Sequence, residues 1–307
     1  MKLCVHAYIA AAVTTAGVVG GAYTAYRVYR RFQMTRLPQK WKQVGTLKDI
    51  YVYPIKSCGG IMLDRAECTI LGLRHGWLRD RVLMVTDEKN NFITARAYPE
   101  LLTVATSVKN SVLTLSHGDM EPLRVNLAEI IELGIPPKMA QVWSVPVPVY
   151  DCGWEASEWI SRCLDKSAGN FRLAYYAAHK SRELRGSTNK FYKFTKNDTG
   201  ALPDEVSFNL INEASVEDLN QKLTDSKVSA RNFRPNFVLE GAQAFEEDNY
   251  KFVKIGENIF EVIKPCTRLD CTEERRSAGN SPRMGLQMAL RSGPGGFVSI
   301  NDHIYCA

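Results

Sequence analysis

Apolar and polar residues alternate with a period close to two along much of the chain, which predicts short β-strands. The alternation is clear at residues 44–53 and 61–70. Shorter apolar runs bounded by Gly, Pro, Asn or Asp predict further strands at 82–86, 101–107, 112–115, 142–150, 208–211, 236–239, 252–255, 259–263 and 297–300. Many short strands separated by turn signals favour a twisted sheet or a barrel. We therefore expect an α+β fold dominated by β-structure.

Two segments instead carry the helical period. Residues 154–164 place apolar side chains on one face at i, i+3, i+4 and i+7, so Cys163 is expected in the core. A second helix is predicted to begin at Ser215 as its N-cap. Glu217 and Asp218 would then lie in the first turn, where the helix dipole favours carboxylates.

The N-terminal stretch has the composition of a membrane anchor. Residues 3–26 contain no Asp, Glu, Lys or Arg. A helix of this length spans a hydrocarbon core of about 30 Å. Because arginines follow this stretch, the positive-inside rule favours a cytosolic position for the rest of the chain. We expect a single transmembrane helix within 1–31 and a polar tether at 32–43. The mitochondrial outer membrane fits this pattern, and the endoplasmic reticulum is the alternative.

Composition narrows the functional classes. The chain has 307 residues, is 45% hydrophobic, and carries a formal net charge of +6. Because Lys and Arg are spread along the sequence, nucleic acid is not an expected partner. The eight cysteines form no CxxC pair, so neither a zinc module nor a secreted disulfide scaffold is indicated.

Basic residues and hydroxyls stand beside several predicted strand ends. Lys56 and Ser57 precede two glycines, where a sharply turning backbone suits an anionic oxygen. Arginines follow at 79, 81 and 96, and Arg234 lies near Asn232 before another predicted strand. A planar guanidinium holds phosphate through two hydrogen bonds. Each cluster taken alone also fits a surface ion pair or a turn.

A pair of thiols flanks an arginine near the C-terminal end. Cys266, Thr267 and Arg268 come just after a predicted buried strand, and Cys271 follows. A neighbouring arginine favours the thiolate, which is both a nucleophile and a soft metal ligand. The spacing therefore allows a metal or redox site, and equally two buried thiols that pack as small hydrophobes.

Together these motifs resemble the MOSC-domain family. The segments are Tyr-Pro-x-Lys-Ser-Cys at 53–58, Gly-Leu-x-x-Gly-x-x-Arg-Asp-Arg at 72–81, Asn-Phe-Arg-Pro-Asn at 232–236 and Cys-Thr-Arg at 266–268. From about residue 44 onward the chain is most similar to the animal amidoxime-reducing branch of that family. The resemblance implies a MOSC N-terminal β-barrel domain, which we place at 44–170, and a MOSC domain at 171–307.

The resemblance also implies a cofactor and a reaction. Family members hold a pterin-dithiolene molybdenum cofactor (Mo-molybdopterin) and reduce amidoximes, hydroxylamines and N-oxides. Their electrons come from NADH through NADH-cytochrome b5 reductase and cytochrome b5. Position by position, the resemblance implies that Lys56, Ser57 and Arg81 bind the pterin and phosphate part of the cofactor. It implies that Asn232 and Arg234 contact the cofactor from the second domain. Thr267 and Arg268 would line its metal end.

The sequence departs from the family at the metal ligand. In the family the run reads Cys-x-Arg-Cys and its second cysteine binds molybdenum, whereas Leu269 occupies that place here. Similarity resumes at 269–276 and 281–285, as if a segment after Arg268 had been removed, either in an alternative transcript or in an incomplete gene model. Cys271 is the first candidate for a replacement metal ligand and catalytic residue, and Cys266 is the second.

Three functional hypotheses follow from these observations. The first is a membrane-anchored molybdenum oxidoreductase that acts on N-hydroxylated compounds. This hypothesis includes the case in which the chain is an inactive member of that class. The second is a non-catalytic protein that binds the cofactor or a partner, which Leu269 favours. The third is a sulfurase-like sulfur carrier, which is weaker because the chain has no room for the pyridoxal-phosphate domain of those enzymes.

Overall fold

The computed structural model describes residues 37–143, 145–166, 169–178, 180, 198–224, 227–266, 283–292 and 295–307. The chain divides into two units, Met1–Trp41 and Lys42–Ala307, and the architecture below is that of the second. The expected transmembrane anchor falls outside the described residues. Within the described part of the chain, no helix has the length and apolar character needed to cross a membrane.

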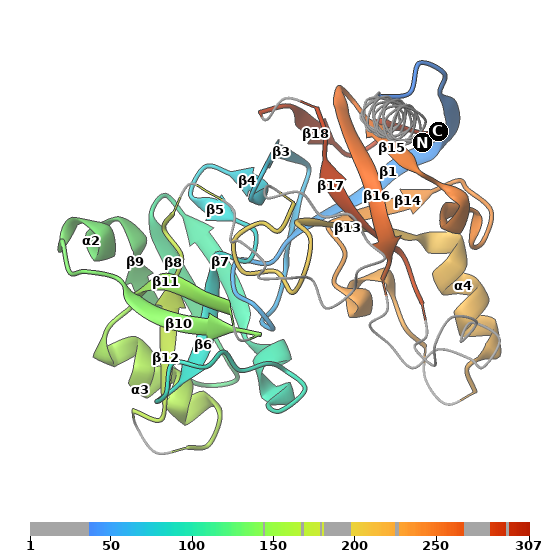
Figure 1. Cartoon of the computed structure of the whole chain (residues 1–307). Coiled ribbons are helices and arrows are strands. Elements are labelled where there is room, and N and C mark those ends of the chain that lie inside the picture. The colour runs from blue at the N-terminus through green and yellow to red at the C-terminus, as the bar shows by residue number, and fades with distance from the viewer. Residues whose placement is uncertain are drawn as a thin grey trace, which may run out of the picture. The chain divides into compact units, whose positions relative to one another are not determined.

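The largest sheet closes on itself (Figure 1). β1 (Lys42–Val52) pairs antiparallel with β19 on one side and with β14 on the other, which joins the two ends of the sheet. β2 (Ile61–Leu63) adds to β1 at its far end. The remaining strands of the closed sheet, in order from β14, are β14 (Phe237–Glu240), β13 (Phe208–Asn212), β17 (Leu286–Leu290), β16 (Asn258–Pro265), β15 (Phe252–Ile255) and β19 (His303–Cys306).

Buried side chains of these strands fill the inside of the closed sheet. Three rings, Phe208, Phe237 and Phe260, meet there with centroids 5.0 to 5.9 Å apart, and each is fully buried. Aromatic side chains supply large apolar area in a small number of positions, so these rings stabilise the barrel. Leu47 and Ile50 of β1 belong to the same core, so the N-terminal strand is part of the barrel interior.

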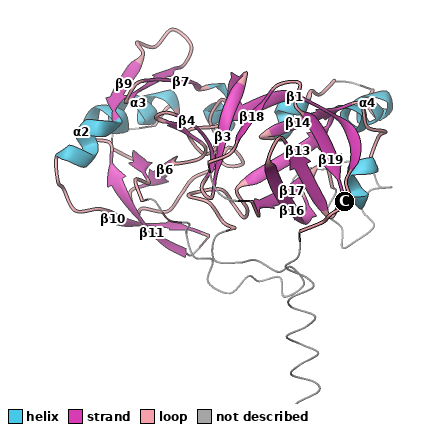
Figure 2. Ribbon diagram, turned by 90° about the horizontal axis from the view of Figure 1, so that it is seen from above, coloured by secondary structure: helices cyan, strands magenta, loops and turns pink. Residues whose placement is uncertain are grey.

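A second core lies among two of the three smaller sheets, whereas the buried side chains of the third, which contains β3, belong to the core of the closed sheet. Figure 2 shows α2 (Leu127–Glu132) and α3 (Trp154–Cys163) in this part, and α4 (Glu213–Lys222) beside the closed sheet. The sheets are β10 (Lys138–Val142), β11 (Val145–Asp151), β12 (Phe171–Tyr175) and β6 (Leu83–Asp87); β18 (Phe297–Ser299), β3 (Arg65–Thr69), β4 (Gly72–His75) and β5 (Leu78–Arg79); and β7 (Ala105–Lys109), β8 (Val112–Ser116) and β9 (Leu123–Asn126).

The β-dominated α+β fold expected from the alternation is confirmed. Most predicted strands form within one or two residues of their expected bounds. Three predictions were wrong in detail. Residues 61–70 form two strands, β2 and β3, which belong to different sheets. Residues 101–107 contain the end of the 3-10 helix η1 (Pro99–Thr103) before β7 begins, and 142–150 contain a turn at Trp143 between β10 and β11. An aromatic residue in a turn, such as Trp143, continues an apolar run, so the apolar pattern does not reveal the turn.

The two helix predictions had different outcomes. α3 forms as expected, and Cys163 is buried in the core. The predicted N-cap of the second helix was wrong, because α4 begins at Glu213 and its cap is Asn212, whose side chain accepts a hydrogen bond from the Ala214 amide. Ser215 instead donates its hydroxyl to the buried carboxylate of Glu247. The role of Ser215 depends on Glu247, which lies in a later segment of the chain, so the sequence around Ser215 could not predict it.

Candidate functional site

The segment that follows β1 presents Lys56 and Ser57 from a tight turn. The Lys56 amide donates to the Leu83 carbonyl at 2.8 Å, and Ser57 has a left-handed backbone with φ of 71°. Gly59 donates to the Val104 carbonyl at 2.9 Å, so close that an added Cβ would lie 2.7 Å from that oxygen. The turn is thus fixed to two neighbouring segments, and it holds Lys56 at 6% exposure.

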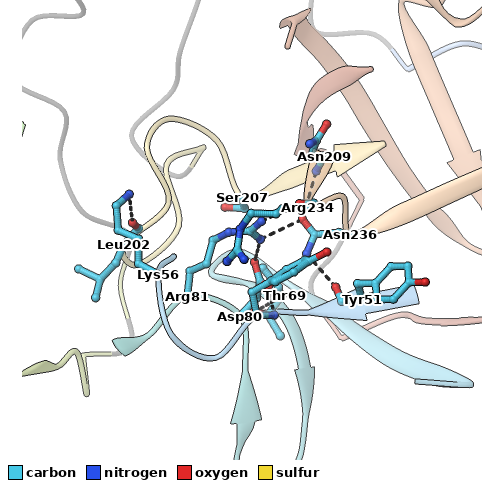
Figure 3. A network of polar contacts seen from close by, with 12 residues as sticks. Tyr51, Lys56, Thr69, Asp80, Arg81, Leu202, Ser207, Asn209, Arg234 and Asn236 are labelled. Atoms are coloured by element: carbon cyan, nitrogen blue, oxygen red, sulfur yellow. Dashed lines mark hydrogen bonds and ion pairs between the residues drawn. The ribbon is translucent and has the colours of Figure 1, made fainter. Parts of the chain in front are cut away.

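Arg81 is held from both its backbone and its guanidinium (Figure 3). Its amide donates to the Tyr53 carbonyl at 2.7 Å, and its φ of 48° is left-handed. The guanidinium is paired with the buried Asp80 and donates to the Arg234 carbonyl at 2.9 Å. These contacts fix the positive charge without fully neutralising its surroundings, because a second arginine lies beside it.

That second arginine is Arg234, which ends the 3-10 helix η2 (Ala230–Phe233) with a left-handed φ of 54°. Its guanidinium donates to the Cys58 carbonyl at 2.5 Å. The Tyr53 ring contacts both arginines, with Arg234 Cζ 4.3 Å and Arg81 Cζ 4.8 Å from its centroid. The ring therefore stabilises both charges through cation–π contact.

Tyr53 is also a polar group in an apolar position. Its ring is 1% exposed, and burial raises the pKa of its hydroxyl to about 12, although the charges of Arg234 and Arg81 oppose this shift. Among the described residues no group forms a hydrogen bond with the Tyr53 hydroxyl. A buried donor of this kind is satisfied in nearly all folded proteins. The Tyr53 hydroxyl is therefore an exception among the buried polar groups of the described residues.

These residues converge on one cavity of about 260 Å³. Its lining includes the five predicted cofactor-binding residues that the structure describes, namely Lys56, Ser57, Arg81, Asn232 and Arg234, but not the described candidate metal ligand Cys266. The segments that carry them are far apart in sequence and come together through β1, the turn after β5 and η2. The predicted residues Thr267, Arg268 and Cys271 lie outside the described part of the chain.

The sequence analysis did not identify the carboxylate in this lining. Asp204 forms an ion pair with Lys56, and it also accepts a hydrogen bond from Trp143 Nε1 at 2.9 Å. Lys56 further donates to the Leu202 carbonyl at 3.2 Å. No local pattern marks Asp204 or Trp143, because each is placed by a loop whose path depends on the rest of the fold. Arg96, which the sequence did mark, also lines the cavity.

Cys266 lies at the end of β16 and not in the cavity lining. It is 2% exposed, and its sulfur accepts a weak contact from Gln287 Nε2 at 3.8 Å. Its amide donates to the Gly285 carbonyl at 2.8 Å. In the described residues no three His, Cys, Asp or Glu side chains gather in a metal-binding group. Its role as a replacement metal ligand stays a prediction.

The charges around the cavity define its chemistry. Four cations line it, Lys56, Arg81, Arg96 and Arg234, against the single carboxylate of Asp204. Such an excess in a partly buried cavity attracts an anion, and guanidinium groups favour phosphate geometry. The charges of the lining therefore favour an anionic ligand.

Comparison with known proteins gives the class. Residues 44–167 match the MOSC N-terminal beta barrel domain, and residues 197–299 match the MOSC domain. The chain belongs to the MOSC-domain family, as the sequence motifs predicted. The first match includes β1, so the sequence segment matched to one domain supplies a strand to the closed sheet built mainly by the other.

The relatives narrow the group within that family. The chain is 34% identical to mitochondrial amidoxime-reducing component 1 of Mus musculus over 84% of its own length and 74% of the relative. It is 36% identical to mitochondrial amidoxime reducing component 2 of Bos taurus over 75% of this chain and 66% of that relative. It is 33% identical to mitochondrial amidoxime-reducing component 1 of Danio rerio over 77% of this chain and 71% of that relative. The chain is thus similar to amidoxime-reducing components throughout most of its length.

The residues present fit a phosphorylated pterin cofactor. Lys56, Ser57, Arg81 and Arg234 supply cationic and hydroxyl donors for a phosphate. A planar arginine stacked on an aromatic ring also offers a flat surface to a heterocycle. The donor set is therefore compatible with the phosphate and pterin end of such a group.

Proposed function

We propose that the cavity binds a pterin-type molybdenum cofactor and that the chain acts in the reduction of N-hydroxylated compounds such as amidoximes, hydroxylamines and N-oxides. The observation that carries this proposal is the meeting of Lys56, Ser57, Arg81, Asn232 and Arg234 at one cavity. It is supported by membership of the MOSC-domain family and by the names of the relatives.

In this proposal the chain's own residues bind and orient the cofactor. Lys56 and Ser57 hold its phosphate, and the guanidinium of Arg234 lies beside them because the Cys58 carbonyl anchors it at 2.5 Å. Arg81 is fixed by Asp80 and so acts as a stationary charge. Fixed charges bind an anion at low reorganisation cost. The cofactor would supply a metal that accepts the hydroxyl oxygen of the substrate while sulfur ligands hold it.

A second candidate function rests on Leu269. Because the family's ligand cysteine is replaced at that position, the chain would bind the cofactor and serve as a non-catalytic binding or interaction protein. Cys271 and then Cys266 are the thiols proposed to take the ligand position in the catalytic case. The two functions share the same cavity and differ only in whether a thiolate reaches the metal.

The cellular setting is proposed by similarity. The relatives are named mitochondrial components, and the apolar N-terminal stretch followed by arginines supports an anchor in the mitochondrial outer membrane with the folded unit in the cytosol. Cytochrome b5 and NADH-cytochrome b5 reductase are the proposed electron donors, and small N-hydroxylated molecules are the proposed substrates.

The proposal is tested on the full chain purified from cells that make the molybdenum cofactor. We expect about one pterin and one molybdenum per chain, and the double variant Lys56→Ala with Arg234→Ala should lose most of both. Benzamidoxime reduction with the two electron-transfer proteins then separates the candidates. Reduction supports the oxidoreductase, whereas bound pterin without reduction supports the binding protein.

A control keeps this test specific. The variant Lys138→Ala with Arg124→Ala removes the same types of charge from exposed positions of β10 and β9 that do not line the cavity. It should retain the parent's pterin content. Parent protein that carries neither pterin nor molybdenum would contradict the proposed function.

A further inference from the structure

Arg96 differs from the other cations of the cavity in what holds its charge. Lys56 is paired with Asp204, Arg81 with Asp80, and Arg234 donates to the Cys58 carbonyl. The guanidinium of Arg96 makes no hydrogen bond or ion pair with any described residue. Within the described part of the chain, Arg96 makes a cation–π contact with the Trp143 ring, whose centroid lies 5.8 Å from Arg96 Cζ. An exposed arginine in a cavity lining, whose guanidinium has no hydrogen-bond partner among the described residues, is suited to bind an anion.

Trp143 is fixed in the position where Arg96 meets it. Its Nε1 donates to Asp204 at 2.9 Å, and Phe92 packs against it edge to face at 5.0 Å. The residue adopts a left-handed φ of 50° in the turn between β10 and β11, and its side chain stays half exposed. Such a backbone is costly for a bulky residue, so the turn stores strain beside the cavity.

We propose that Arg96 is a phosphate-binding arm that leaves the Trp143 ring and moves onto the terminal phosphate of the ligand on binding. The inference rests on the proposed cofactor-binding function and adds a residue to it. The fixed cations bind the ligand from the base of the cavity, and Arg96 binds it from the mouth. Because its contact with Trp143 is a weak one at an exposed position, little is lost when it moves.

The movement has a consequence for Trp143. Its indole loses the cation above one face when Arg96 leaves, while Asp204 and Phe92 continue to hold the ring. Tryptophan fluorescence responds to such a change in nearby charge, so phosphate binding should alter the emission of Trp143. Free inorganic phosphate and the phosphate of the cofactor share the chemistry that Arg96 recognises, so each is measured separately.

The experiment compares Arg96→Gln and Arg96→Lys with the parent full chain. Two quantities are measured, the pterin content of protein purified from cofactor-producing cells and the Kd for inorganic phosphate of pterin-free protein. A charge-assisted hydrogen bond at this partly exposed position predicts about a tenfold weaker Kd for Arg96→Gln. Arg96→Lys keeps the charge but lacks the planar fork, so its Kd should be intermediate.

Arg124→Gln is the matched control, since Arg124 is an exposed arginine of β9 outside the cavity. It should match the parent in both measurements. If Arg96→Gln also matches the parent while the parent binds pterin and phosphate, the inference is wrong and the proposed function stands. If the parent binds neither, both are overturned.

A second variant checks the storage position on Trp143. Trp143→Phe keeps an aromatic face and removes both the indole emission and the bond to Asp204. The parent's emission should change on addition of inorganic phosphate, and this change should be lost in Trp143→Phe. A change that persists in Trp143→Phe comes from another tryptophan and contradicts the movement of Arg96.

Discussion

At the scale of single residues, the cavity depends on groups whose chemistry is unusual for their surroundings. Tyr53 carries a buried hydroxyl without a partner among the described residues, and two arginines contact its ring. Gly60 packs against the same ring, where an added Cβ would lie 2.4 Å from Tyr53 Cε1. The ring therefore has no freedom to turn its hydroxyl toward water.

Removal of the Tyr53 hydroxyl is therefore expected not to destabilise the fold, unlike removal of a hydroxyl that forms a hydrogen bond. Tyr53→Phe should leave the free energy of unfolding of the pterin-free protein unchanged or raise it by about 1 kcal/mol, because a buried unsatisfied group is removed. In contrast, Tyr176→Phe should lose about 1 kcal/mol, since the Tyr176 hydroxyl donates to the Lys180 carbonyl at 2.8 Å. Urea unfolding of both variants measures the difference. A clear loss in Tyr53→Phe would contradict the assignment of its hydroxyl as unpartnered.

At the scale of elements, a buried carboxylate joins α4 to the 3-10 helix η3 (Glu246–Asn249). Glu247 accepts hydrogen bonds from Ser215 and Asn212 at the start of α4, and both residues are buried with it. Burial raises the pKa of Glu247 above its ordinary 4.5, although these hydrogen bonds oppose the shift. The same bonds explain why Asn212 begins the helix and Ser215 does not.

The raised pKa predicts a direction for the pH dependence of stability. Between the unfolded and the folded pKa of Glu247, the folded state holds the proton that the unfolded state releases, so the free energy of unfolding falls as pH rises through that window. Glu247→Gln does not titrate and should show a smaller fall from pH 4.5 upward. Chemical unfolding at several pH values measures both slopes. Equal slopes in the parent and the variant would assign the pH dependence to other groups.

At the scale of the whole folded unit, β1 makes the barrel a single cooperative structure. It pairs with β14 and β19, which lie far later in the chain. Its register shifts between Gln43 and Gly45 in the pairing with β19, and between Leu47 and Asp49 in the pairing with β14. At Gly45 an added Cβ would lie 2.0 Å from the Glu240 carbonyl oxygen of β14. The closure therefore requires a residue without a side chain.

Gly45→Ala should separate β1 from β14 and lower the free energy of unfolding by roughly 2 kcal/mol or more. Because β1 leads directly into the turn that carries Lys56, pterin content should fall with it. Gly118→Ala is the comparison, as it has open space around it and a left-handed φ of 50°, so only about 1 kcal/mol is expected there. Thermal unfolding measures both variants, and an unperturbed Gly45→Ala would show that the two strands tolerate wider spacing.

The sequence by itself determined the β-dominated fold class, most strand positions and the five described residues that share the cavity. Alternation of apolar residues is a local property, and cations beside glycine or proline turns mark strand ends without reference to the rest of the chain. Only the tertiary structure decided that β1 closes the barrel, that Ser215 serves Glu247, and that Asp204, Trp143 and Arg96 meet at the mouth of the cavity. These contacts join residues far apart in sequence, and their energy exists only after the backbone between them has folded.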